Sequence, residues 1–155
     1  MPSILDLSVR LKTKDVAVPR QPARVLVVDD DPLILQLEAT ILRRAGHHVD
    51  IAKDGECGWQ ALLAARYDLL VTDCQMPRMS GLDLVLQLRA AQMTLPVIMA
   101  SGSLESLNIE TLTHAPSRIH AFVRKPFTIS QLLGAVKSAL EPSSDGDRSP
   151  QMALG

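Results

Sequence analysis

The sequence has few cysteines, almost no net charge and no long apolar run, and each shortage excludes a class of protein. Only two of its 155 residues are cysteines, Cys57 and Cys74, which is too few for a disulfide framework or a cysteine metal knuckle. The formal net charge of −1 offers no basic surplus for nucleic acid. No stretch reaches the roughly 20 apolar residues of a membrane span, and residues 1–21 lack the apolar core of a secretory signal. We therefore expect a cytoplasmic protein with reduced thiols that binds neither membranes nor nucleic acid directly.

The remaining composition is that of one globular domain with polar ends. Hydrophobic residues make up 46% and charged residues 21%, and the length suits a single core. Residues 1–22 mix charges with prolines and keep no clear apolar period, so they are predicted to form a mobile arm. Residues 142–155 are rich in polar, turn-forming residues and are predicted to be a disordered tail. The folded unit is expected to span residues 23–141.

Short apolar runs alternate with helical patterns inside this unit. The runs lie at residues 25–28, 49–52, 69–72, 97–100 and 119–123. Helical spacing follows the N-cap pair Asp31-Pro32, recurs at residues 54–66 and 82–92, weakens at 104–112 and returns after Thr128. Several runs are continuously apolar, which is typical of strands buried on both faces. The alternation predicts an α/β fold, a doubly wound five-stranded parallel sheet with five helices.

Acidic residues stand at the ends of two of these runs. Asp29 and Asp30 end the first run and Asp73 ends the third, and parallel strands bring their carboxyl ends to one edge of the sheet. Two carboxylates 4 Å apart repel by roughly 4 kcal/mol at an effective dielectric of about 20, so the cluster needs a cation or a proton. A site made of oxygen ligands alone favours Mg²⁺. Asp31, which follows directly, is interpreted as a helix cap.

Two further polar residues are expected at the same edge. Ser101 follows the fourth apolar run and Lys125 follows the fifth. A carboxylate, a hydroxyl and an ammonium beside a metal ion suit the transfer of a phosphoryl group to the carboxylate. In that interpretation the metal, Lys125 and Ser101 each take one of the phosphoryl oxygens.

Four segments, in this order, resemble the receiver domain of two-component response regulators. They are Asp29-Asp30, the segment from Asp73 to Gly81, the segment from Pro96 to Gly102, and the segment from Phe122 to Phe127. The resemblance covers about residues 24–140, nearly the whole folded unit. It implies a flavodoxin-like fold with the strand order 2-1-3-4-5.

The resemblance also implies a role for each acidic residue. Asp73 corresponds to the phosphoacceptor. Asp30 and Asp73 correspond to direct Mg²⁺ ligands, with the backbone carbonyl of Gln75 as a third, and Asp29 would act on the metal through water. The side chain of Gln75 stands at a position that tunes the lifetime of the phosphoryl group in this family.

Three residues outside the acidic cluster also take roles from the resemblance. Ser101 would hydrogen-bond the phosphoryl group, and Lys125 would pair with it, with a cis peptide bond expected before Pro126. Phe122 matches the aromatic switch position, which moves inward when the hydroxyl residue is drawn toward the phosphate. Serine replaces the commoner threonine at position 101, and Gly102 stands where alanine is usual; neither change removes a function.

The resemblance implies signalling rather than turnover of a separate substrate, so we do not expect an enzyme. The expected partners are a histidine kinase or a histidine phosphotransfer protein and an unknown downstream protein. A receiver fragment of a hybrid histidine kinase is an open alternative. A phosphatase of the haloacid dehalogenase superfamily would need a second acidic pair on a later strand, and the acids after Lys125 come only at or beyond the last helix. A phosphorylation-independent adaptor would be free to lose the acidic residues, all of which are present.

Overall fold

The computed structural model describes residues 22–142 and 151–153, and a parallel sheet forms its centre. The five predicted strands are β1 (Arg24–Val28), β2 (His48–Ala52), β3 (Leu69–Asp73), β4 (Val97–Ser101) and β5 (Ala121–Arg124). They lie parallel in the order β2-β1-β3-β4-β5, which confirms the predicted order. The predicted mobile arm lies outside the described residues, except for its last residue.

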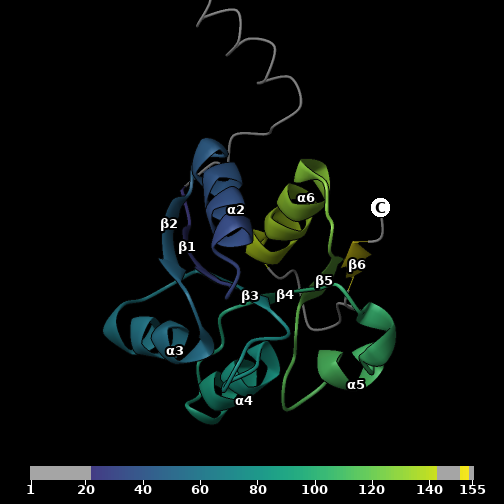
Figure 1. Cartoon of the computed structure of the whole chain (residues 1–155). Coiled ribbons are helices and arrows are strands. Elements are labelled where there is room, and N and C mark those ends of the chain that lie inside the picture. The colour runs from purple at the N-terminus through teal and green to yellow at the C-terminus, as the bar shows by residue number, and fades with distance from the viewer. Residues whose placement is uncertain (1–21, 143–150, 154–155) are drawn as a thin grey trace, which may run out of the picture.

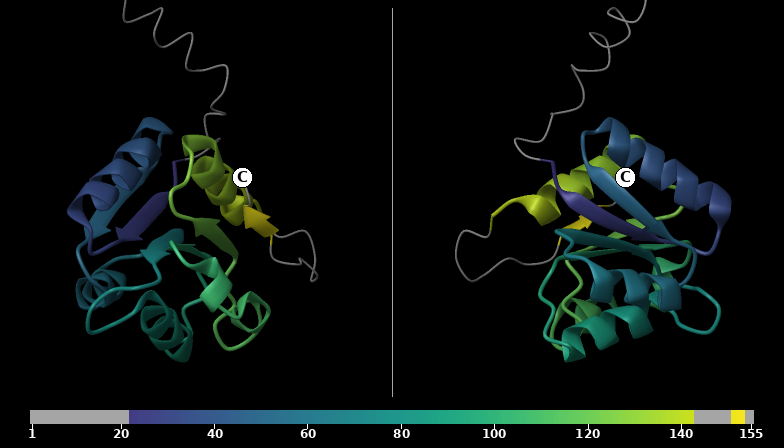
Figure 2. Two further views of the ribbon diagram at one scale, coloured as in Figure 1. Left: turned by 45° about the vertical axis from the view of Figure 1, so that its right-hand side comes forward. Right: turned by 90° about the vertical axis from the view of Figure 1, so that its left-hand side faces the viewer.

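Helices cover both faces of this sheet (Figure 1). They are α2 (Pro32–Arg44), α3 (Gly55–Ala64), α4 (Gly81–Ala90), α5 (Ile109–Thr113) and α6 (Ile129–Leu140), with a 3₁₀ turn η1 (Leu104–Ser106) before α5. Helices α2 and α6 lie over one face, and α3, α4 and α5 lie over the other, as the two views of Figure 2 also show. Within residues 22–142, none of these helices is long and apolar enough to cross a membrane.

Burial from both sides explains the continuously apolar runs. In β1, Val25 and Val27 belong to the core cluster under α2 and α6, while Leu26 and Val28 belong to the cluster on the opposite face. All four side chains are fully buried. Successive strand residues point to opposite faces, so a strand covered on both sides needs an apolar residue at every position.

The predicted helix starts are confirmed in detail. The side chain of Asp31 accepts hydrogen bonds from the backbone N–H groups of Leu33 and Ile34, and proline follows it at the first helical position of α2. Thr128 and Gln131 form the predicted capping box at the start of α6. These side chains satisfy N–H groups that have no partner within the first turn of a helix.

The weak helical stretch expected at residues 104–112 is confirmed only in its second half. The structure has the short turn η1, then a break, then α5. Asn108 causes the break, since its side chain accepts a hydrogen bond from the backbone N–H of Thr111 and caps a new helix at that point. An asparagine favours such a cap over a place within a helix.

The end of the chain also differs from the prediction. Part of the tail expected to be disordered forms a sixth strand, β6 (Gln151–Ala153), which pairs in parallel with β5. The physical reason is the open side of β5, where unpaired backbone N–H and C=O groups accept an added strand. The remaining tail residues, 143–150 and 154–155, lie outside the described part of the chain.

Candidate functional site

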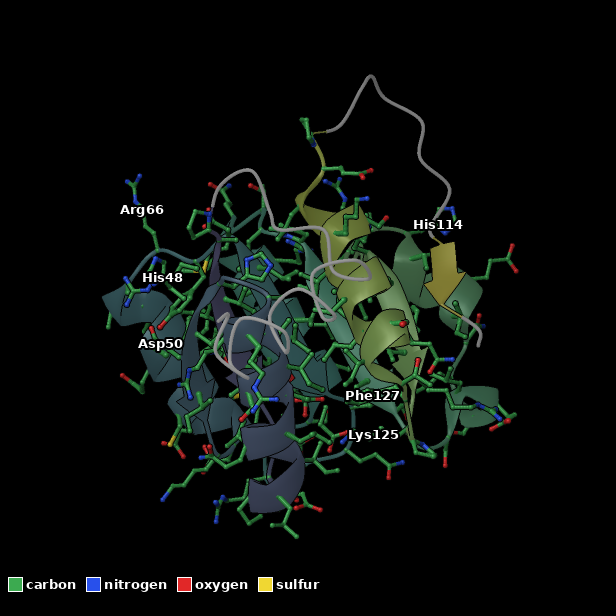
Figure 3. The ribbon with its side chains drawn as sticks, turned by 90° about the horizontal axis from the view of Figure 1, so that it is seen from above. His48, Asp50, Arg66, His114, Lys125 and Phe127 are labelled. Atoms are coloured by element: carbon green, nitrogen blue, oxygen red, sulfur yellow. The ribbon has the colours of Figure 1, made fainter. Side chains whose placement is uncertain are left out.

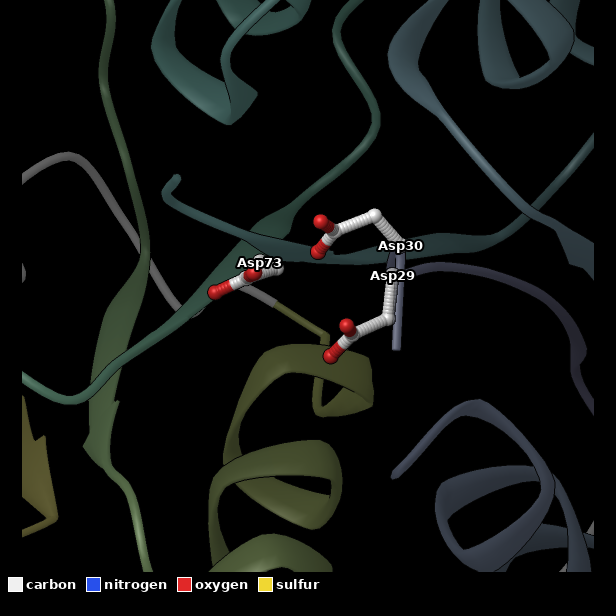
Figure 4. Close-up of side chains that lie close together, drawn as sticks. All are labelled: Asp29, Asp30 and Asp73. Atoms are coloured by element: carbon white, nitrogen blue, oxygen red, sulfur yellow. The ribbon is translucent and has the colours of Figure 1, made fainter. Parts of the chain in front are cut away.

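The three predicted carboxylates meet at one edge of the sheet (Figure 4). Strands β1 and β3 are neighbours, with Val28 opposite Thr72, so the residues that follow these two positions lie close together. Asp29, Asp30 and Asp73 each offer an oxygen, and these oxygens lie within 4.8 Å of one another. Asp29 is buried and Asp30 is exposed, so the cluster runs from the core to the surface.

Lys125 neutralises part of this charge. Its Nζ lies 2.7 Å from Oδ2 of Asp29 and 3.2 Å from Oδ1 of Asp73. The side chains are 19% exposed for Lys125, 1% for Asp29 and 12% for Asp73, so water screens these contacts weakly. Figure 3 shows Lys125 and Phe127 near α6, away from Asp50 on the side of β2.

Burial and charge act on the two partners in different ways. Burial raises the pKa of Asp73 above its ordinary value; Lys125 opposes this rise, and the nearby charge of Asp29 adds to it. For Lys125, burial would lower the pKa, but the hydrogen bond and the charge of Asp29, together with those of Asp73, outweigh burial and raise it. The lysine is therefore held in its charged form against two carboxylates.

Ser101 completes the predicted set of residues at this edge. Asp73 lies opposite Ala100 in the sheet, so Ser101 is one residue beyond the position paired with Asp73. Ser101 is buried, and its Oγ accepts a hydrogen bond of 3.1 Å from the backbone N–H of Ser103. Its carbonyl accepts a hydrogen bond of 2.8 Å from the backbone N–H of Lys125. The peptide bond between Lys125 and Pro126 is cis, as expected.

The donor set at this edge fits Mg²⁺. Three carboxylates supply oxygen atoms within 4.8 Å of one another, and hard cations of this kind prefer oxygen ligands. Gln75, the predicted carbonyl ligand, lies in the loop that follows β3, and its side chain is exposed. With one ammonium against three carboxylates, the site has negative charge to spare for a divalent cation.

Comparison with known proteins identifies this arrangement. Residues 25–137 match the family described as the response regulator receiver domain. The chain belongs to this family of two-component signalling proteins. Membership of this family explains the fold, the strand order and the acidic edge that were expected from the resemblance.

Relatives and solved structures agree with this assignment. The probable transcriptional regulatory protein TcrX of Mycobacterium tuberculosis is 32% identical over 139 residues, which cover 87% of this chain and 58% of TcrX. The transcriptional regulatory protein GlrR of Escherichia coli is 32% identical over 126 residues, covering 80% of this chain but 28% of GlrR. This receiver chain thus spans about half or less of these relatives.

Two solved structures share this fold along all or nearly all of their own chains. The chemotaxis response regulator CheY4 of Vibrio cholerae is 28% identical with a TM-score of 0.69, and the match covers 77% of this chain and all of CheY4. The response regulator TrrA of Thermotoga maritima, solved in complex with Mg²⁺ and BeF, is 28% identical with a TM-score of 0.68. That match covers 76% of this chain and 99% of TrrA.

The predicted switch residue of the receiver domain is fully enclosed. Phe122 is 1% exposed and belongs to the core cluster that contains Met99, Leu104 and Ile119. It lies on β5 opposite Met99 of β4, on the face covered by α3, α4 and α5. The aromatic ring of Phe122 is therefore turned into the core.

A buried acid near the site was missed by sequence reasoning. Glu38, on the buried face of α2, is 1% exposed, and in the described part of the chain its Oε1 is the one buried side-chain oxygen or nitrogen without a hydrogen-bond partner. Burial raises its pKa to about 8; Asp29 and Asp73 contribute to this rise, and Lys125 opposes it. The helical spacing of the apolar residues in α2 places Glu38 on the buried face, and this spacing could have indicated its burial.

Gly81 is the second residue that the sequence did not mark as part of the site. A Cβ atom at this position would overlap the carbonyl oxygen of Asp73. The backbone N–H of Gly81 also donates a hydrogen bond of 2.9 Å to the carbonyl of Cys74. A glycine is required because the first turn of α4 packs directly against the backbone that carries Asp73.

We expect Gly81→Ala to disturb the acidic edge and to destabilise the domain by about 1–3 kcal/mol, because the added methyl group must displace the Asp73 backbone. The matched control is Gly134→Ala within α6, where a Cβ meets nothing within 4 Å. There alanine should stabilise the helix by about 0.5–1 kcal/mol. Urea unfolding of the three proteins measures both changes. Equal stability of the two variants would contradict the close packing at Gly81.

We expect Glu38→Gln to remove a pH dependence of stability between about 4.5 and 8. In this window the folded protein holds a proton on Glu38 that the unfolded chain has released, so wild-type stability falls as the pH rises. The stability difference between the two proteins should change by roughly 4 kcal/mol across the window, in favour of the variant at high pH. Unfolding in EDTA at several pH values measures this difference.

Comparing the two proteins separates Glu38 from Asp73 and His47, whose pKa values are also shifted and which both proteins share. The exposed residue Glu56 provides the control, since Glu56→Gln should follow the wild-type curve. Parallel curves for the wild type and Glu38→Gln would show that the buried acid is not protonated in the folded state.

Proposed function

We propose that this receiver domain accepts a phosphoryl group on Asp73 in the presence of Mg²⁺, from a histidine kinase or a histidine phosphotransfer protein. The single observation that carries the proposal is the position of Lys125, whose Nζ contacts both Asp29 and Asp73 at the carboxylate cluster. A cation beside an acceptor carboxylate and two further acids is what phosphoryl transfer to aspartate requires.

The chemical step is balanced at Asp73 and the donor histidine. A carboxylate oxygen of Asp73 attacks the phosphorus, the phosphorus–nitrogen bond of the phosphohistidine breaks, and the imidazole keeps the electron pair and takes up a proton. Bound Mg²⁺ would neutralise part of the negative charge on the phosphoryl oxygens. Asp30, Asp73 and the carbonyl of Gln75 would hold the ion directly, and Asp29 would act through water.

The lysine and the serine take the remaining oxygens. Lys125 lies 3.2 Å from Asp73 and can turn its ammonium to a phosphoryl oxygen, exchanging one anionic partner for another. The Oγ of Ser101 accepts a hydrogen bond from Ser103 and keeps its own O–H for donation to a third oxygen.

We expect the chain to be labelled once by acetyl phosphate with Mg²⁺, giving a mass increase of one phosphoryl group that Asp73→Asn abolishes. Asp31→Asn is the matched control, because asparagine also caps α2 while removing one nearby charge. Intact-protein mass spectrometry measures the label. Repeated turnover of unrelated phosphomonoesters would favour a phosphatase, and an unlabelled wild type at every Mg²⁺ concentration would favour a phosphorylation-independent adaptor.

Exposed apolar residues beside the site supply a docking surface for the phosphoryl donor. Leu33 and Leu37 on α2 are 80% and 50% exposed, and Ile129 at the start of α6 is 57% exposed. Helices α2 and α6 contact each other, and each begins just after a strand end that carries site residues. Exposed apolar side chains gathered beside a reactive group are typical of a protein-binding surface.

We expect Leu37→Gln to slow labelling by a phosphorylated histidine phosphotransfer protein roughly fivefold to tenfold, as the loss of an interface leucine would. Labelling by acetyl phosphate should not change, because the small donor needs no protein contact. The control is Leu63→Gln on α3, since Leu63 is similarly exposed, at 56%, on the opposite face of the sheet. Equal slowing of both variants would place the donor elsewhere.

The identity of the donor, the downstream protein and the cytoplasmic location stay predictions. The relatives TcrX and GlrR are named as transcriptional regulatory proteins, and the matches cover 58% and 28% of them. We infer that this domain signals through protein contacts or phosphoryl relay, without direct nucleic-acid contact, because its formal net charge is −1. No separate substrate turnover is expected.

A further inference from the structure

The outer edge of β5 is closed by a distant part of the same chain. Strand β6 pairs in parallel with β5, with Ala121 opposite Gln151, Phe122 opposite Met152, and Val123 opposite Ala153. Figures 1 and 2 show β6 beside β5 at the end of the sheet. Without β6, β5 would be the edge strand, and the backbone groups of the switch residue Phe122 would be open on that side.

Helix α6 covers the part of the sheet where the parallel strand β6 is added. It contacts β5 and β6, so the added strand packs under a helix that is already in place. The connection from β5 through α6 to β6 also repeats the strand–helix–strand order of the other parallel pairs. An extended segment that adds to this edge therefore gains main-chain hydrogen bonds together with a helical cover.

The occupying segment is short and uncharged. It consists of three residues, Gln151, Met152 and Ala153. A pairing of this length supplies few hydrogen bonds, each worth about 1 kcal/mol, so the segment can leave without unfolding the domain. A segment held by so few hydrogen bonds can be displaced by an extended chain that pairs more strongly with β5.

We propose that the β5 edge is a strand-accepting surface, and that Gln151–Ala153 occupies it reversibly and keeps it closed to extended segments of other proteins. The occupant in this chain is its own C-terminal segment. A partner that fits the edge is an extended, largely uncharged peptide that runs parallel to β5. This proposal goes beyond phosphoryl transfer at Asp73 and does not rest on it.

The edge is also tied to the site by contacts on the other side of β5. Arg124 lies opposite Ser101 in the sheet and forms an ion pair with Glu105 of η1, and Lys125 follows it directly. A segment bound at the edge therefore holds the strand that leads into Lys125. Strand β5 therefore both pairs with the segment at the edge and leads directly into Lys125.

Hydrogen exchange of the full chain tests the proposal. Replacing Met152 and Ala153 together by proline removes the N–H that points to β5, because neighbouring strand residues point to opposite sides. The control replaces both residues by serine, which keeps both N–H groups. In the proline variant, β5 amides that point toward β6 should exchange roughly tenfold faster than in the wild type. Amides of β5 that point toward β4 should keep their protection in all three proteins.

A peptide with the sequence of residues 150–155 supplies the second measurement. Added to the proline variant, it should shift the NMR signals of β5 amides, whereas the wild type and the serine control should resist it. Equal exchange at β5 in all three proteins would overturn the proposal, as would a peptide that shifts β5 equally in all three or in none. Labelling of Asp73 by acetyl phosphate, measured on the same samples, tests the proposed function separately.

Discussion

The ion pairs of Lys125 hold together an edge of the sheet that its own carboxylates would push apart. The parallel topology forces Asp29, Asp30 and Asp73 to the same place, because strands β1 and β3 are neighbours and both end there. Lys125 comes from beyond β5, with β4 and β3 between it and β1, so its long side chain is needed to reach Asp29. One ammonium leaves a negative surplus, and this surplus suits the site for a divalent cation. The cation and Lys125 would then offset the charge of a phosphoryl group.

The same electrostatics explain the buried Glu38. Helix α2 starts at the acidic edge and packs along the sheet, which places the second turn of the helix within reach of the charges of Asp29, Asp73 and Lys125. An ionised Glu38 would lack both water and a hydrogen-bond partner, and burial together with the charges of Asp29 and Asp73 raises its pKa, so the folded protein retains a proton on Glu38. The neutral acid keeps the net charge of the site from becoming more negative.

Two surfaces of the domain are the proposed sites of contact with other proteins, and one of them, the β5 edge, is occupied by β6. The exposed residues Leu33 and Leu37 of α2 and Ile129 of α6 form the surface proposed to bind the phosphoryl donor. The β5 edge is the side of β5 that faces away from β4, and Lys125 follows directly after β5. The relatives TcrX and GlrR, which are named as transcriptional regulatory proteins, are longer than this chain.

Much of the fold followed from local chemistry. The caps Asp31 and Thr128 and the continuously apolar strand runs depend on hydrogen bonds and burial that are set within a few residues. The strand-end positions of Asp29, Asp73 and Lys125 could therefore be predicted, and with parallel strands so could their meeting at one edge. The helix expected at residues 104–112 begins only after Asn108, because the capping preference of this residue outweighs a weak helical spacing before it.

The sequence by itself determined which residues meet, because strand ends and the sheet direction fix their positions in advance. Tertiary structure decided how they meet: which carboxylates Lys125 contacts, that Glu38 rather than Leu37 faces the core, and that Gly81 must lack a side chain. It also decided that Gln151–Ala153 pairs with β5. These outcomes depend on the exact rotation of a helix or on the approach of segments far apart in the chain, and neither leaves a periodic signal in the sequence.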